Sequence, residues 1–111
     1  MTGSGTGIGR EIALEFARQG ADVVLHYAHS DSGANSAVDE IREMGRNAAA
    51  FRADFDNVDD VVALAESAVA FLSRVDCLVN NAGITFNKPF LHVTREHFYR
   101  MSHLNIPTQF F

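Results

Sequence analysis

The chain has 111 residues, of which 47% are apolar and 21% charged, and its formal net charge is −5. This length allows one hydrophobic core, and the composition is typical of a globular domain rather than a disordered chain. The acidic balance and the scattered arginines exclude the basic patch of a nucleic-acid-binding protein. No apolar run approaches the ~20 residues of a membrane span and no signal-peptide pattern is present, so we expect a cytoplasmic protein.

A glycine-rich segment opens the chain, with Gly3, Gly7 and Gly9 at the spacing of a phosphate-binding loop. Glycine permits a positive φ and close approach of a ligand to the main chain, and the N-terminus of a following helix attracts anions. Such a loop normally follows a buried strand, but only Met1 precedes it here. By itself, the segment is equally compatible with a flexible tail that runs into a helix.

Apolar runs then alternate with helical patterns, which predicts a parallel sheet with helices on its faces. A first helix is expected over residues 8–19, ended by Gly20, and a buried strand over residues 23–25 with Tyr27. The residues expected on the apolar face of this helix are Ile8, Ile12, Ala13 and Phe16.

The alternation continues with a second helix, capped by Asp31 or Ser32 and ended by Gly45, and a strand over residues 48–52. Asn57 is expected to cap a third helix.

A further buried strand is predicted at residues 77–79, with Cys77 as a small buried apolar residue. As the single cysteine, Cys77 excludes an internal disulfide and a thiolate metal cluster. After a loop, Thr94 is expected to cap a last helix that contains Pro107.

The opening loop and the tetrapeptide Asn80–Gly83, with the elements between them, resemble the short-chain dehydrogenase/reductase family. Members carry T-G-x-x-x-G-x-G after the first strand and N-N-A-G after the fourth, and Asp54 and Asn105 match as well. The resemblance implies an α/β fold, a Rossmann-like doubly wound parallel sheet. Residues 1–111 are expected to form a partial dinucleotide-binding domain that lacks the first strand and the C-terminal half.

In this fold the first strand lies between the second and the fourth. Without it, both neighbours are expected to face a gap about 10 Å wide, twice the usual strand spacing. Each unpaired buried backbone group costs roughly 1–3 kcal/mol. We therefore expect the sequence to be a fragment or incomplete reading frame of a longer enzyme.

The resemblance implies a nicotinamide dinucleotide as cofactor. The diphosphate is expected along the opening loop, at Gly3, Thr6, Gly7, Ile8 and Gly9. The adenosine is expected beside the later motifs, at Asp54, Phe55, Asn81, Ala82 and Gly83. Alternative interpretations stay open, because an aspartate after a strand commonly caps a turn and paired asparagines also form turns without a ligand.

The residue that ends the second strand of this fold selects the coenzyme, because a carboxylate there binds the ribose hydroxyls of NAD and repels a 2′-phosphate. Tyr27 occupies the position, so NADP is preferred over NAD. Thr6 stands where many NADP-dependent members carry a basic residue, which leaves His29 as the nearby group able to carry positive charge.

Family members reduce carbonyls with a tyrosine whose pKa is lowered by a lysine four residues later, assisted by a serine. The single lysine, Lys88, follows Ile84 at this spacing, so the Tyr-x-x-x-Lys motif is absent from these residues. Of the catalytic set, Asn105 alone is represented, and in the family it holds a water at a helix distortion. Pro107 is either the cause of such a distortion or the mark of a helix end.

No metal site is expected, because His26 and His29 face opposite sides of a strand and the later histidines lack helical i,i+4 spacing. Surface or partly buried histidines without a functional role are the default interpretation.

We expect an alcohol or carbonyl compound as substrate and a homo-oligomeric parent enzyme. Two alternative functions remain: a nucleotide-binding module without chemistry, and a methyltransferase-like Rossmann domain that binds another adenosyl ligand.

Overall fold

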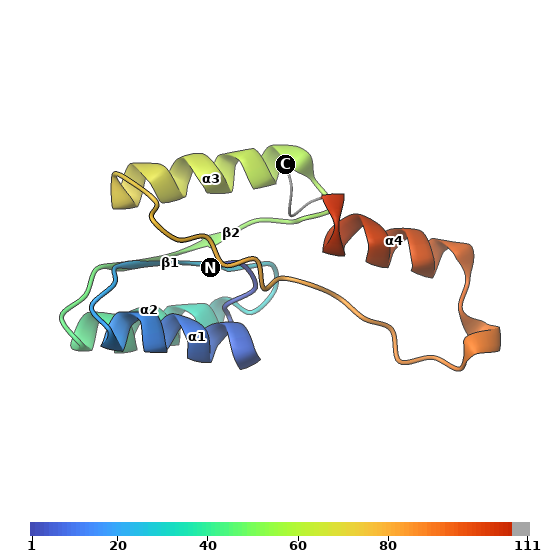
Figure 1. Ribbon diagram of the computed structural model, residues 1–111, viewed down its shortest axis with the longest axis horizontal. Helices are drawn as coiled ribbons and strands as arrows, with labels where there is room; N and C mark the ends of the chain where they lie inside the picture. Colours follow the sequence, from blue (N-terminus) through green and yellow to red (C-terminus); the bar gives the residue numbers. More distant parts are fainter. Residues whose placement is uncertain (108–111) are drawn as a thin grey trace.

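The computed structural model describes residues 1–107 (Figure 1). Its elements alternate as α1 (Gly7–Arg18), β1 (Val23–Tyr27), α2 (Asp31–Glu43), β2 (Ala48–Arg52), α3 (Val58–Leu72), the 3-10 helix η1 (Phe90–His92) and α4 (Arg95–Asn105). The two strands pair in parallel, with Val23 opposite Ala48 and Tyr27 opposite Arg52. The predicted α/β class and its Rossmann-like order are confirmed.

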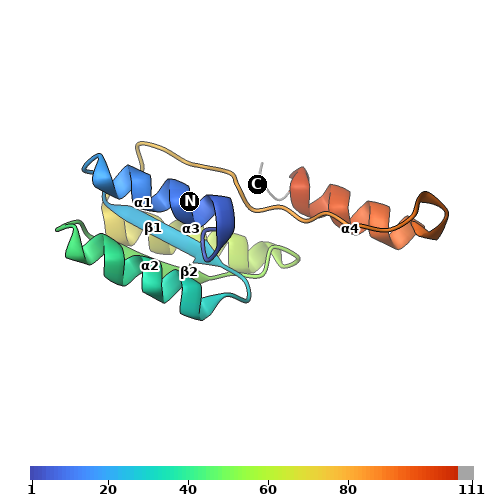
Figure 2. The same ribbon diagram turned by 90° about the horizontal axis from the view of Figure 1, so that it is seen from below.

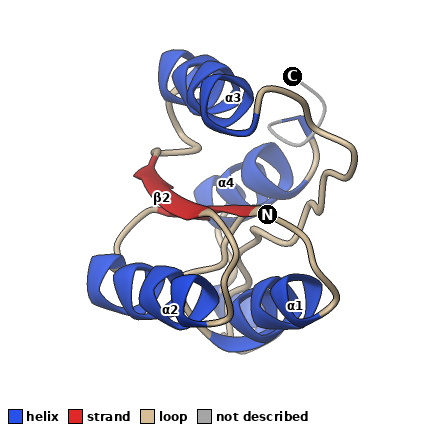
Figure 3. Cartoon of the chain, turned by 90° about the vertical axis from the view of Figure 1, so that its left-hand side faces the viewer, coloured by secondary structure: helices blue, strands red, loops and turns tan. Residues whose placement is uncertain are grey.

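Helices cover both faces of the sheet (Figure 3). α1 and α2 lie side by side on one face and α3 lies on the other. The main core lies between the sheet and the α1–α2 layer, and it consists of small and medium aliphatic side chains: Ala13, Leu14, Ala17, Val23, Leu25, Ala37, Val38, Ile41 and Ala48.

The buried face of α1 agrees with the predicted one at Ala13 and differs from it elsewhere. Leu14 and Ala17 are buried, whereas Ile8 is 75% exposed and Phe16 is 37% exposed. Helical spacing alone allows either stripe, and packing against the sheet and α2 selects the one that contains positions 13, 14 and 17.

The predicted caps of α3 and α4 are confirmed, but the predicted cap of α2 is wrong, because Asp31 and Ser32 lie within the helix and Ser30 precedes it. Asn57 Oδ1 accepts a hydrogen bond from the Asp59 amide at the start of α3, and Thr94 forms a capping box with His97 at the start of α4. α4 ends at Asn105, so Pro107 lies beyond the helix and not within it as predicted. Proline disfavours the helical conformation of the residue before it, which explains this end.

The four residues of the opening segment, Met1–Ser4, occupy part of the gap predicted beside β1. The amino group of Met1 donates to the Val24 carbonyl, and the Ser4 amide donates to the His26 carbonyl at 2.8 Å. On the side of the opening segment that faces away from β1, the Thr2 amide donates to the Val79 carbonyl at 3.0 Å. The predicted gap is therefore bridged at the carboxyl end of β1.

Residues 77–79 do not form the predicted strand, and Cys77 is exposed rather than buried. A strand needs a neighbour along its length, and among residues 1–107 this segment is held by the Thr2 contacts at Val79. A cavity of about 780 Å³ lies alongside it, lined by Val23 and Val24 of β1 and by the inner face of α3.

α4 projects away from the layered part of the molecule (Figure 2). Arg100 Nη2 lies 3.5 Å from Asp56 Oδ2, and none of the helix residues is buried. No helix of residues 1–107 is long and apolar enough to cross a membrane.

Candidate functional site

The opening loop turns into α1 through two glycines with positive φ, Gly3 at +61° and Gly7 at +59°. Other residues rarely adopt this conformation. A Cβ atom on Gly7 would meet no protein atom within 4 Å. The backbone at Gly7 therefore faces open space at the start of the helix, where a ligand can approach it.

The N-terminus of α1 differs from the starts of α2, α3 and α4, each of which has an acidic residue in its first turn. Thr6 makes no side-chain cap hydrogen bond, and the first turn contains no acidic residue. By contrast, α3 has the Asn57 cap and acidic residues in its first turn. Because Thr6, Gly7 and Ile8 are exposed, the positive end of the α1 dipole is accessible to an anion.

The structure brings the opening loop and the later tetrapeptide into direct contact. A Cβ on Gly3 would lie 2.8 Å from the Ala82 Cα, and a Cβ on Gly9 would lie 2.3 Å from Asn81 Nδ2. Side chains at either position are excluded by this approach. Gly3 and Gly9 thus serve the packing of the two motifs, whatever the loop binds.

Hydrogen bonds join the two motifs through Thr2 and Asn81. The Thr2 hydroxyl oxygen accepts from the Asn81 and Ala82 amides at 3.0 Å each. Asn81 Nδ2 donates to the carbonyls of Thr2 and Gly3, also at 3.0 Å each. The Asn81 side-chain amide therefore holds the loop from within the protein.

Gly33, in the first turn of α2, is a site residue that the sequence interpretation missed. A Cβ there would lie 2.1 Å from the Gly5 carbonyl oxygen, so α2 approaches the loop as closely as glycine allows. A glycine inside a predicted helix was the available signal, because it usually has a packing or functional reason.

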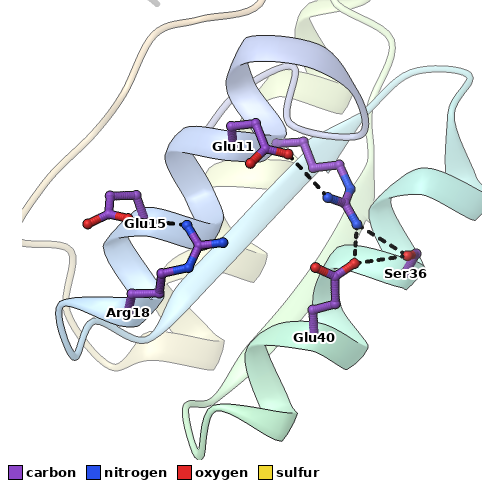
Figure 4. A network of polar contacts seen from close by, with 6 residues as sticks. Glu11, Glu15, Arg18, Ser36 and Glu40 are labelled. Atoms are coloured by element: carbon purple, nitrogen blue, oxygen red, sulfur yellow. Dashed lines mark hydrogen bonds and ion pairs between the residues drawn. The ribbon is translucent and has the colours of Figure 1, made fainter.

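Arg10 links α1 to α2, and Figure 4 shows its labelled partners Glu11, Ser36 and Glu40. Its guanidinium group forms an ion pair with Glu40 and a hydrogen bond with Ser36, both on α2, and it also contacts Glu11 on its own helix.

Asp54 and Phe55 lie directly after β2, close to the carboxyl end of β1. Asp54 Oδ1 accepts from the Asp56 amide at 3.0 Å, so this carboxylate caps a turn, as the alternative interpretation proposed. Phe55 is buried, and its ring stacks on His26 with a centroid distance of 4.2 Å and an interplanar angle of 6°.

His26 was assigned no role from the sequence, but the structure places it at the centre of the site. Its Nδ1 atom accepts from the Gly3 amide at 3.0 Å, and its Nε2 atom lies 3.0 Å from the Ala53 carbonyl oxygen. The residue is 3% exposed, and burial lowers the pKa of the ring. The available signal was a histidine within an apolar strand.

Tyr27 ends β1 opposite Arg52, the last residue of β2. The Arg52 Nε atom donates to the Ala28 carbonyl at 3.1 Å, which brings its guanidinium group beside the segment that follows Tyr27. Arg52 was missed because the sequence interpretation considered only neighbours along the chain, such as the exposed His29.

Asn105, the last residue of α4, pairs with the main chain beyond the tetrapeptide. Its Oδ1 atom accepts from the Ile84 amide and its Nδ2 atom donates to the Ile84 carbonyl, both at 2.9 Å. A Cβ on Gly83 would lie 3.2 Å from Asn105 Oδ1. Asn105 is therefore brought to the same region as Gly83, while Lys88 lies apart, 2.9 Å from His97 Nε2.

Among residues 1–107, no group of three or more histidine, cysteine or acidic side chains is gathered as a metal site requires.

Comparison with known proteins gives a consistent result. The family described as short chain dehydrogenase matches residues 1–111. The short chain dehydrogenase mdpC of Emericella nidulans is 42% identical over all 111 residues, and hydroxynaphthalene reductase arp2 of Aspergillus fumigatus is 40% identical. The chain spans 42% and 41% of the length of these two relatives.

Solved structures agree with this comparison. A blue fluorescent protein from a metagenomic library, in complex with NADPH, superposes with a TM-score of 0.91 and 36% identity, over 98% of this chain and 45% of that one. A dehydrogenase/reductase from Sinorhizobium meliloti gives a TM-score of 0.93 and 34% identity, over 98% and 43%.

Proposed function

The chain belongs to the short-chain dehydrogenase/reductase family, and on that premise we propose that it forms the dinucleotide-binding part of an NAD(P)-dependent oxidoreductase. The single observation that carries the proposal is the uncapped, exposed start of α1 directly after the positive-φ turn at Gly7. The complete protein is proposed to transfer hydride between a nicotinamide coenzyme and an alcohol or carbonyl substrate.

The diphosphate is proposed to bind at the first turn of α1. Amides of Gly7, Ile8 and Gly9 belong to the first turn, where a helix leaves its backbone donors without partners inside the helix. A bound diphosphate supplies both the missing acceptors and the negative charge that the dipole favours. The open space beside Gly7 fits a ligand that approaches the main chain.

The adenosine is proposed to lie between the segment after β2 and the tetrapeptide. Asp54 and Phe55 supply the contacts on one side, and Ala82 and Gly83 on the other. The Asn81 side-chain amide is already bonded to Thr2 and Gly3, so we propose that Asn81 orients the loop instead of contacting the coenzyme.

NADP is the proposed coenzyme. No carboxylate stands at Tyr27 to repel a 2′-phosphate, and Arg52 brings a positive charge close to the same strand end. The solved neighbour in complex with NADPH supports the same choice.

Asn105 is proposed to take part in proton transfer, because its amide is fixed beside Gly83 by the two bonds to Ile84. The Tyr-x-x-x-Lys motif is absent from these 111 residues, so the proton donor is proposed to come from other residues of the complete enzyme. When bound, the coenzyme supplies the hydride. Relatives named hydroxynaphthalene reductase make a hydroxynaphthalene the first substrate to test.

Calorimetric titration of the complete protein with NADPH, NADH and S-adenosylmethionine tests the proposal. We expect saturable binding of NADPH, weaker binding of NADH and none of S-adenosylmethionine. Binding of S-adenosylmethionine alone supports the methyltransferase-like alternative, and NADPH binding without hydride transfer to any carbonyl compound supports a module without chemistry.

A further inference from the structure

His26 lies between the two halves of the proposed coenzyme site and contacts both. On one side it meets Gly3, at the turn of the glycine loop. On the other it meets the Ala53 carbonyl and stacks on Phe55, in the segment proposed to contact adenosine. Its own amide and carbonyl bind Ser4 and Met1, so the backbone and the ring of one residue hold the loop together.

These contacts define the protonation state of the ring. A backbone amide only donates, so Nδ1 facing Gly3 must be the unprotonated nitrogen. A carbonyl oxygen only accepts, so Nε2 facing Ala53 must carry the proton. Both bonds are satisfied together by one neutral tautomer.

We propose that His26 is a positioning residue of the dinucleotide site, whose neutral ring locks the turn at Gly3 to the Ala53–Phe55 segment so that the two halves of the site form one rigid unit. The inference rests on the proposed function and deepens it. A ligand that bridges both halves binds more tightly when their separation is set in advance, because less conformational freedom is lost on binding.

Protonation of His26 breaks this lock on one side only. A proton on Nδ1 faces the Gly3 amide, so two donors oppose each other, while the bond from Nε2 to Ala53 remains. Burial favours the neutral ring and lowers its pKa, and in the 111-residue chain the amino group of Met1 acts in the same direction. The other groups that face the ring, Phe55 and the Ala53 carbonyl, are uncharged. Coenzyme affinity is therefore coupled to pH through Gly3.

Two substitutions separate the contacts. His26→Asn places an amide oxygen close to the position of Nδ1, so the Gly3 bond is kept without a titrating group, while the Ala53 bond and the stacking are lost. His26→Phe keeps a ring against Phe55 and loses both hydrogen bonds. His92→Asn, at an exposed histidine in η1, is the matched control.

NADPH binding to the complete protein and its variants is measured by coenzyme fluorescence from about pH 8 to about pH 5. Loss of an uncharged hydrogen bond predicts that His26→Phe binds about three- to tenfold more weakly at the higher pH. The wild type is expected to lose affinity on acidification more steeply than His26→Asn, with His92→Asn following the wild type. Titration of the coenzyme phosphate affects all variants equally, so it cancels when the affinity of a variant is divided by that of the wild type at the same pH. Equal affinity of His26→Phe and wild type, or equal slopes for His26→Asn and wild type, overturns the proposal.

Nitrogen NMR of histidine-labelled, coenzyme-free wild type decides the geometry independently of binding and of variant folding. We expect an unprotonated Nδ1 and a protonated Nε2 for His26, and a Gly3 amide signal that shifts as the ring titrates. A protonated Nδ1 in the neutral ring overturns the inference. If the wild type binds no NADPH, the proposed function fails, and the nitrogen spectrum still shows whether the ring holds Gly3.

Discussion

Asn81 binds Thr2 twice: its main-chain amide donates to the threonine hydroxyl, and its side-chain amide donates to the threonine carbonyl, at 3.0 Å each. Residues 79 positions apart in the sequence are thus fastened together, and a further bond from Asn81 to Gly3 extends the contact into the glycine loop. The two sequence motifs form one structural unit.

Removing the Asn81 side chain is expected to destabilise the protein. In Asn81→Ala, the carbonyls of Thr2 and Gly3 lose their donor, which predicts a loss of about 1–3 kcal/mol in the free energy of unfolding. Asn81→Asp is expected to cost at least as much, because a carboxylate then faces two carbonyl oxygens. Urea unfolding measures both, with Asn80→Ala, at the exposed neighbouring asparagine, as the control. Equal losses of stability in Asn80→Ala and Asn81→Ala contradict a stabilising role for the hydrogen bonds of the Asn81 side chain.

Gly7→Ala is expected to weaken coenzyme binding, because Gly7 has a positive φ in the turn that leads into the proposed diphosphate site. Gly20→Ala is the matched control: Gly20 also has a positive φ and open space around its Cβ position, but it lies at the other end of α1. Both changes are expected to lower stability by about 1 kcal/mol. Only Gly7→Ala is expected to raise the Kd for NADPH, by about tenfold or more. A similar Kd for both variants argues against diphosphate binding at this turn.

Gly33→Ala tests the contact between α2 and the loop. The added methyl group would collide with the Gly5 carbonyl, a backbone atom that cannot rotate away. Overpacking of this kind predicts a loss of about 1–3 kcal/mol in stability, although alanine is the better helix former. Thermal unfolding compares Gly33→Ala with Asn35→Ala, an exposed position of the same helix. Stabilisation by Gly33→Ala means that the close approach is absent in solution.

Coenzyme preference is expected to respond to the ends of β1 and β2. Tyr27→Asp introduces a carboxylate that repels a 2′-phosphate and accepts from ribose hydroxyls, so the ratio of NADPH to NADH affinity is expected to fall by about tenfold or more. Arg52→Ala is expected to lower the ratio by a smaller factor, since the guanidinium group lies at the neighbouring strand end. Dissociation constants for both coenzymes provide the test. An unchanged affinity ratio in Tyr27→Asp refutes the placement of the adenosine ribose beside residue 27.

Stability is expected to fall on acidification because of His26. Burial lowers the pKa of His26 in the folded protein, so between this pKa and the unfolded value of about 6.5 the unfolded chain binds more protons. The contribution of His26 is therefore complete above the unfolded pKa and decreases as the pH falls through the folded one. Urea midpoints measured across this range are expected to drop more steeply for wild type than for His26→Asn. If the urea midpoints of the wild type and of His26→Asn change equally with pH, the lowered pKa of His26 is contradicted.

The sequence predicted most elements because their signals are local. The strand at residues 48–52 and the caps at Asn57 and Thr94 are confirmed. The prediction of a strand at residues 77–79 is wrong, since a strand exists only where a neighbour completes its hydrogen bonds. Cofactor contacts proposed for the glycine loop and for Asp54 stay predictions.

Spacing of glycines, cap residues and apolar runs by itself determined the order of the elements and the position of the glycine loop, because each depends on backbone preferences of near neighbours. The family was indicated by the resemblance of the glycine loop and Asn80–Gly83 to known motifs. Only the tertiary structure decided that Asn81 bonds to Thr2 and that His26 joins Gly3 to Ala53. It also decided that the Gly5 carbonyl packs directly against Gly33. Hydrogen bonds and close contacts of this kind join residues far apart in sequence, so they are set by how the strands and helices pack.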